Sequence, residues 1–215
     1  VPFRAHRVRA GEPEPHLSPG LLAVEVAADD RVARLGDAAA EGKAGERRLA
    51  WCHNARGLAG HEHDWEYSVR VLKESGFTDL IVNLSWGARA FYASKVLEVD
   101  PSVGTDGDAL EQCLAACRKY GVACHIWKVC WRARQNMQDF TPPGDCQKSF
   151  DGKVNKLWMC PSDPVNRASE MNQFLELARM GPDMILFDYI RYPSGWQCTC
   201  EGCREQFEAL TGLQI

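Results

Sequence analysis

The 215-residue sequence contains no apolar run that approaches the roughly 20 residues needed to span a bilayer. Its first ten residues, V-P-F-R-A-H-R-V-R-A, lack the apolar centre of a signal peptide, and no initiating Met precedes them. We therefore expect no membrane span. We also expect a processed, engineered or partial chain, so the missing targeting signals say little about where the protein works.

A basic stripe with interleaved aromatics is also missing. The chain has 25 Lys and Arg against 29 Asp and Glu, a formal net charge of −4, and so does not favour a nucleic-acid partner. Neither G-x-G-x-x-G nor G-x-x-x-x-G-K-[ST] follows a strand-like segment, which argues against nucleotide-binding folds. What is present, 45% hydrophobic and 25% charged residues, is typical of a globular protein with one full-sized core.

Residues 1–46 differ in composition from the rest. Four of the eleven prolines cluster there with several glycines. A segment rich in glycine, alanine and charged residues, G-D-A-A-A-E-G-K-A-G-E, follows. This composition predicts an N-terminal extension, or the tail of a preceding domain, that ends in a linker. Residues 47–215 form the second predicted unit.

Short apolar strands and amphipathic helices alternate from residue 47 onward. Strands are predicted at 49–51, 79–84, 122–129 and 184–188, and helices at 63–76, 106–121 and 165–181. A last helix is predicted to carry Cys203, Phe207 and Leu210 on one side. On the third helix the apolar face is predicted to be Met171, Phe174, Leu175 and Ala178. The α/β pattern with continuous apolar strands indicates a parallel sheet, either open and doubly wound or a (β/α)8 TIM-type barrel. Four units make half a barrel, so in the barrel interpretation the other half lies beyond Ile215.

Polar and aromatic side chains follow all four predicted strands, where parallel α/β folds place their functional groups. The candidate substrate-binding residues are His53, Asn54, Asn83, Trp86, His125, Trp127, Lys128, Tyr189, Arg191 and Tyr192. Trp51, Trp86, Trp127, Trp131 and Trp196 also lie at or after strands. Sugar rings suit such a surface, since their C–H faces stack on aromatics while their hydroxyls need polar partners. The alternative is that these tryptophans are packing residues.

Several segments resemble the glycosyl hydrolase-like family 10, a group of (β/α)8-barrel proteins. They are F-D-Y-I-R-Y-P at 187–193, G-F-T-D-L-I-V-N-L at 76–84, A-F-Y-A-S at 90–94, Y-G-V-A-C-H-I-W at 120–127 and W-M-C-P-S-D-P at 158–164. The resemblance implies a barrel with a carbohydrate substrate and a site at the strand ends. It makes Asp188 the leading acidic candidate, surrounded by His125, Trp127, Tyr189 and Arg191, and it favours a secreted or periplasmic location.

Asp188 has two interpretations. Glycoside hydrolysis needs two carboxyl groups, and Asp188 can be one, with its partner expected on a later strand. Arg191 would then keep Asp188 ionised, which suits a nucleophile or stabiliser better than a general acid. Alternatively, Asp188 and Arg191 form an ion pair that braces a loop. The protein as a whole is then a glycoside hydrolase, a catalytically inactive carbohydrate-binding barrel or a zinc-stabilised structural domain.

Ten cysteines are many for a reduced cytosolic enzyme. Cys113 and Cys117 lie four residues apart on a predicted helix face, and Cys124 and Cys130 flank an apolar strand, so these four are expected to be small buried hydrophobes. In contrast, Cys198, Cys200 and Cys203 supply three thiols within six residues, which can wrap one tetrahedral zinc if one outside ligand closes the site.

Cys160 is the natural fourth ligand. The combination of its C-P-S segment with the later C-T-C-E-G-C is similar to the four-cysteine zinc site of family 42 β-galactosidases. Four thiolates leave no position open for water, so the zinc would be structural. A disulfide, which the C-x-C spacing would strain, and a chance cluster of buried thiols are the alternatives.

Overall fold

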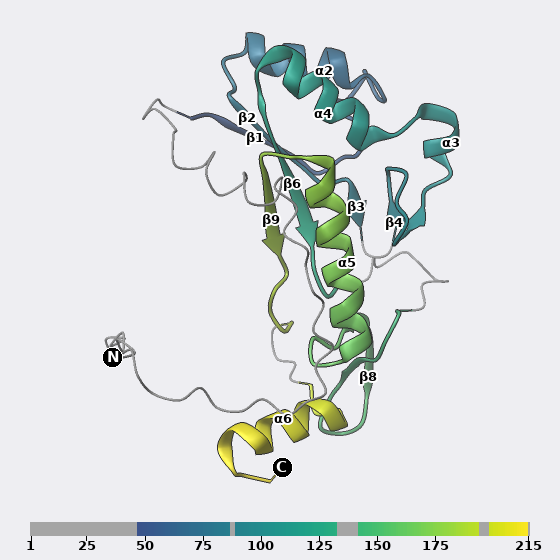
Figure 1. Cartoon of the computed structure of the whole chain (residues 1–215), viewed down its shortest axis with the longest axis vertical. Helices are drawn as coiled ribbons and strands as arrows, with labels where there is room; N and C mark the ends of the chain where they lie inside the picture. The colour runs from purple at the N-terminus through teal and green to yellow at the C-terminus, as the bar shows by residue number, and fades with distance from the viewer. Residues whose placement is uncertain (1–46, 87–88, 133–141, 194–197, 215) are drawn as a thin grey trace.

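A computed structural model describes residues 47–86, 89–132, 142–193 and 198–214 (Figure 1). Its centre is a parallel sheet of β1 (Leu49–Cys52), β2 (Asp79–Val82), β6 (Ala123–Val129) and β9 (Met184–Asp188). The strands lie in the order β1-β2-β6-β9, which is also their order along the chain. The four predicted strands and their parallel arrangement are therefore confirmed.

Three helices connect the strands: α2 (Trp65–Glu74), α4 (Ala109–Tyr120) and α5 (Pro164–Met180). Each begins after an aspartate, Asp64, Asp108 or Asp163, whose side chain accepts a hydrogen bond from a backbone N–H of the first turn. The last two helices end at Gly121 and Gly181, both in the left-handed conformation that glycine adopts without strain. Local sequence signals thus set the helix boundaries.

All three helices pack against the same face of the sheet, so the main core is one layer between helices and strands. In Figure 1, α2 and α4 lie side by side, and α5 runs along β6 and β9. The strands contribute Leu80, Val82, Cys124 and Ile126 to this core, and the helices contribute Trp65, Val69, Leu110, Cys113, Leu114, Cys117 and Leu177. The opposite face carries a smaller cluster, described with the candidate site below.

The structure contains short elements that the sequence pattern does not predict. These are β3 (Ser85–Trp86), β4 (Arg89–Ala90), β5 (Glu98–Val99), α3 (Ser102–Asp106), and a hairpin of β7 (Cys146–Lys148) and β8 (Val154–Met159). The last helix, α6 (Glu201–Thr211), is where the sequence predicts one, but it buries none of its residues in the core. None of the helices among the described residues has the length and apolarity required to cross a bilayer.

The predicted apolar face of α5 is wrong. Met171 is 50% exposed, whereas the helix buries Asn166, Glu170, Gln173 and Leu177. Asn166 is tolerated there because it has partners: its amide donates to the backbone oxygens of Asp145 and Cys160. Glu170 is paired with a lysine of β6, as described below. The predicted segment 1–46 lies outside the described residues.

Asp79, at the start of β2, is a buried acid held by three donors. Its carboxylate accepts hydrogen bonds from Thr78 Oγ1 at 2.6 Å and Arg47 Nε at 3.1 Å, and it lies 2.6 Å from His125 Nε2. Burial alone would raise the pKa of Asp79, but the hydrogen bonds from Arg47, Thr78 and His125 outweigh it and lower the pKa to about 2. The Asp79 carboxyl group is therefore ionised in the folded protein at neutral pH.

We expect Asp79→Asn to lower the free energy of unfolding at pH 7 by about 2 kcal/mol, because a pKa unit corresponds to about 1.4 kcal/mol. Since the folded-state pKa is depressed, the wild-type contribution is full above about pH 4 and is lost as the pH falls toward 2. Urea unfolding between pH 2 and 7 measures it. A variant that keeps the wild-type acid dependence over this range would show that Asp79 does not cause it.

Candidate functional site

Asp188 lies at the carboxyl end of β9 and is held by two donors. Trp127 Nε1 donates to its Oδ2 at 3.0 Å, and the backbone N–H of Tyr189 donates to its Oδ1 at 2.7 Å. Trp127 comes from the neighbouring strand β6, where Val129 is the register partner of Asp188. Asp188 therefore belongs to the sheet face opposite the helices, and its orientation is fixed by the sheet.

Aromatic side chains extend from this contact across the sheet to β1. The ring of Trp127 makes edge-on contacts with Trp51, at 5.2 Å between ring centroids, and with His53, at 4.6 Å. Trp127 is buried, whereas Trp51 is 50% exposed and His53 is exposed. We call Trp51, His53, Trp127, Asp188 and Tyr189 the strand-end site. It combines an open aromatic surface with one carboxylate.

The predicted candidates His53, Trp127, Asp188 and Tyr189 are thus brought together. The sequence places Trp51 at a predicted strand, but Trp51 is not among the predicted binding residues. The signal that could have found it is strand alternation, because the register pairs Trp51 with Ile81 on the face that carries Trp127.

His125 and Asn83 lie on the same face but are less accessible. His125 is 4% exposed and paired with Asp79, one alternation farther from the strand ends than Trp127. Asn83 follows β2 and is 3% exposed, and its Nδ2 has no hydrogen-bond partner in the described structure. Asn83 can therefore still donate to a ligand, whereas His125 serves as a partner of Asp79.

Lys128 is the candidate that the structure places elsewhere. It points to the helix-covered face of β6, and its Nζ forms a 3.1 Å ion pair with Glu170 of α5, with both side chains almost fully buried. Successive strand residues point to opposite faces, so Lys128 cannot share a surface with Trp127. Its position indicates a structural ion pair between sheet and helix.

Lys128→Met is expected to destabilise the fold by about 3 kcal/mol, because it leaves the Glu170 carboxylate buried without its cation. The double variant Lys128→Met/Glu170→Leu should recover most of this loss, since a buried ion pair and an apolar pair are of similar stability. Urea unfolding of the three proteins tests this. Unchanged stability of the single variant, accompanied by loss of saccharide binding, would restore Lys128 to the binding residues.

Arg191 does not make the predicted ion pair with Asp188 in the described structure. Its guanidinium lies over the ring of Tyr189, 5.1 Å from the centroid, and over Trp158 at 5.8 Å. Two further candidates have other contacts: the exposed Asn54 caps its own turn by accepting from Arg56 N, and the Tyr192 hydroxyl is 3.9 Å from Cys203 Sγ. The side chain of Trp86 and all of Trp196 lie outside the described residues.

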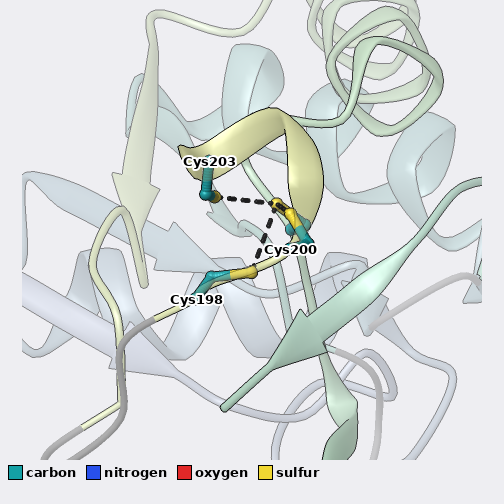
Figure 2. Close-up of side chains that lie close together, drawn as sticks. Cys198, Cys200 and Cys203 are labelled. Atoms are coloured by element: carbon teal, nitrogen blue, oxygen red, sulfur yellow. Dashed lines mark hydrogen bonds between the residues drawn. The ribbon is translucent and has the colours of Figure 1, made fainter. Parts of the chain in front are cut away.

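The four predicted metal-ligating cysteines converge on one point. Figure 2 shows the side chains of Cys198, Cys200 and Cys203 directed toward one another at the start of α6. Cys160, just after β8, has its Sγ 3.5 Å from those of Cys200 and Cys203 and 3.6 Å from that of Cys198. All four sulfurs lie within 4.8 Å of one another, so this group can bind a metal ion.

Burial raises the pKa of two of the four thiols, Cys160 and Cys200. Cys160 is fully buried, and burial is the main cause that raises its pKa, with the Cys203 and Cys200 thiols adding to it. Burial also raises the pKa of Cys200 to about 11. A cation that binds here must therefore displace protons from the thiols.

A second group of thiols, Cys113, Cys117 and Cys124, also lies within 4.8 Å. All three are buried in the main core among apolar side chains, as expected for cysteines that act as small hydrophobes.

No protein-family model matches the chain, and no curated protein matches it. The chain does align with solved structures. The described residues have a fold similar to part of two glycosidases. An exo-β-N-acetylglucosaminidase of family GH20 from Vibrio harveyi aligns with a TM-score of 0.53 at 10% identity, over 76% of this chain and 30% of that one. An α-L-fucosidase from Paenibacillus thiaminolyticus aligns with a TM-score of 0.56 at 18% identity, over 79% and 27%.

A hypothetical protein from Ruminiclostridium thermocellum ATCC 27405 aligns with a TM-score of 0.51 at 17% identity, over 67% of this chain and 78% of that one. The chain therefore spans most of this protein but less than a third of either glycosidase. At these identities the likeness concerns the fold.

Proposed function

We propose that this chain is part of a glycoside hydrolase-like protein that binds an oligo- or polysaccharide at the strand-end site, with Asp188 as one of its two catalytic carboxylates. The observation that carries the proposal is the hydrogen bond from Trp127 Nε1 to Asp188, because it joins a carboxylate to an aromatic surface that reaches solvent through Trp51 and His53. Saccharide sites need both parts: flat apolar faces for the sugar ring, and a carboxylate for its polar edge.

The geometry suggests a role for Asp188. Both of its oxygens act as hydrogen-bond acceptors, from Trp127 Nε1 and from Tyr189 N. A carboxylate held in this way suits a nucleophile, or a stabiliser of the positive charge that develops on the sugar, better than a proton donor. We assign the proton donor to a second carboxylate on a strand that follows β9 in the intact barrel.

The barrel itself is part of the proposal. Strands in chain order, with three helices on one face, are the arrangement of the first half of a (β/α)8 barrel, whereas a doubly wound sheet reverses its order and places helices on both faces. Both outer strands also expose large apolar side chains, Trp51 on β1 and Met184 and Phe187 on β9. Further strands would cover them. The resemblance to glycosyl hydrolase-like family 10 supports the same architecture.

We further propose that the ion held by the four cysteines is a structural zinc. A tetrahedral zinc with Zn–S bonds of about 2.3 Å places its sulfurs about 3.8 Å apart. The separations of 3.5 to 3.6 Å from Cys160 lie close to this value. The ion would tie the end of β8 to the segment that follows β9, and thereby fix the loop beside Asp188.

Two measurements on a panel of neutral and acidic polysaccharides test the proposed function. The release of reducing ends measures hydrolysis, and calorimetry with the same polysaccharides measures binding. Hydrolysis of at least one is expected from the intact gene product that contains these residues. Binding without hydrolysis would support the catalytically inactive barrel instead. Neither binding nor hydrolysis would contradict the proposed function.

A further inference from the structure

Two arginines lie against one pair of aromatic rings next to the strand-end site. Trp158 and Tyr189 are 5.6 Å apart between ring centroids. The guanidinium carbons of Arg132 and Arg191 lie 5.2 and 5.1 Å from the Tyr189 centroid, and both lie 5.8 Å from the Trp158 centroid. Because both carbons are about 5 Å from the same ring, the two positive charges are at most about twice that distance apart.

Neither guanidinium has an acidic partner among the described residues. Arg132 Nη1 donates to the Tyr189 hydroxyl at 3.1 Å, which leaves its other N–H groups without a carboxylate. Other arginines of the described residues do have acidic partners: Arg70 pairs with Glu74, and Arg89 pairs with Glu98. Two positive charges lie against the same aromatic pair, and neither has a carboxylate partner in the part of the chain that the structure describes. This arrangement suits a ligand that carries a negative charge.

The backbone around the two arginines is held in place. Trp131, just before Arg132, and Tyr189 both have positive φ angles, 57° and 58°, which non-glycine residues rarely adopt and which concentrate at functional sites. The backbone of Arg132 forms a β-bridge with Trp158, and Tyr189 N donates to Asp188. The aromatic pair therefore has a fixed position relative to the carboxylate.

We infer that the saccharide bound at the strand-end site carries an anionic group, a carboxylate or a sulfate, which Arg132 and Arg191 bind beside Tyr189. This inference rests on the proposed function, since it names the class of saccharide. Guanidinium groups bind both anions through paired N–H donors. The net charge of −4 gives the chain no general attraction for anions, so selectivity for an acidic saccharide must come from these two side chains.

Two matched pairs of oligosaccharides test the inference by isothermal titration calorimetry on the intact protein. Hexagalacturonate is compared with its methyl ester, and sulfated cellohexaose with cellohexaose, so each pair differs in charge on the same sugar chain. The charged member of at least one pair is expected to bind about tenfold more tightly or better. The pair that shows the difference distinguishes carboxylate from sulfate.

The same titrations with Arg132→Gln and Arg191→Gln are expected to remove most of this preference, and Arg167→Gln, at an exposed arginine of α5, is expected to keep it. Thermal melts check that each variant folds, and Arg191 is exposed, so its variant tests the inference even if Arg132→Gln is unstable. Equal binding of both members, or a preference that persists in Arg191→Gln, contradicts this inference alone. If the wild type binds none of the four, this inference is overturned, whereas the proposed function is overturned only if the whole panel described above is neither bound nor hydrolysed.

Discussion

Cys160→Ser is expected to abolish zinc binding and to lower the Tm by more than about 10 °C. The Sγ of Cys160 lies within 3.6 Å of all three partner sulfurs, and Cys160 is the only ligand of the group that comes from outside residues 198–203. Structural zinc sites contribute on the order of 10 kcal/mol, comparable with the whole stability of a domain. Zinc quantitation after dialysis and thermal unfolding measure the two effects.

Cys146→Ser is the matched control. Cys146 lies in β7, where its register partner Met159 directly precedes Cys160, yet it is not part of the thiol group. It should leave zinc content and Tm nearly unchanged. Less than about one equivalent of zinc in the wild type, or a Cys160→Ser protein that retains its zinc, would contradict the four-cysteine site.

The effect of zinc should extend to the strand-end site. The Tyr192 hydroxyl contacts Cys203 Sγ, and Thr199 N donates to Lys148 O, so the cluster connects the segment after β9 with the β7–β8 hairpin. That hairpin carries Trp158, which packs on Tyr189. Loss of the ion should therefore weaken saccharide binding as well as stability, because it releases two segments that border Asp188.

Asp188→Asn is expected to reduce hydrolysis by the intact protein on the order of 10³-fold, the scale of losing a positioned catalytic carboxylate. Asparagine keeps the size of the side chain and an oxygen that can accept from Trp127 Nε1, but it removes the negative charge. Saccharide affinity should therefore change by only a few fold. Reducing-end release and calorimetric binding on the same preparation separate the two quantities.

Asp151→Asn provides the control, since Asp151 is exposed in the turn between β7 and β8. It should hydrolyse at the wild-type rate. If Asp188→Asn also hydrolyses near the wild-type rate, Asp188 is not catalytic, and its contact with Trp127 is a packing arrangement.

The sequence predicted the sheet and its helices because their signals are local. The strands are short runs of mostly apolar residues, Asp108 and Asp163 begin helices, and Gly121 and Gly181 end them. The strands β3 to β5 were missed because two residues cannot show a period. The buried face of α5 was missed for a different reason: Glu170 is tolerated there because of Lys128, 42 positions earlier, and such pairing across elements leaves no local pattern.

The candidate site was predicted in part. Trp127 and Asp188 were both expected at strand ends, and the parallel register brings them into contact. Lys128 was grouped with them because it is adjacent to Trp127 in sequence, although strand alternation sends it to the other face. The sequence predicts that Arg191 pairs with Asp188. In the structure Tyr189 adopts a positive φ, and the Arg191 guanidinium lies over the Tyr189 ring instead. Such a backbone conformation at a tyrosine has no signature in the sequence.

The most direct test of the strand-end site is the indole N–H signal of Trp127 in a ¹H–¹⁵N spectrum during titration with a saccharide that binds. Trp127 Nε1 donates to Asp188, and its ring contacts Trp51, so a sugar seated there must change its surroundings. We predict that the Trp127 signal shifts on binding, whereas that of Trp65, buried in the helix-covered core, does not move. Saturating binding that leaves the Trp127 signal unmoved would contradict the site.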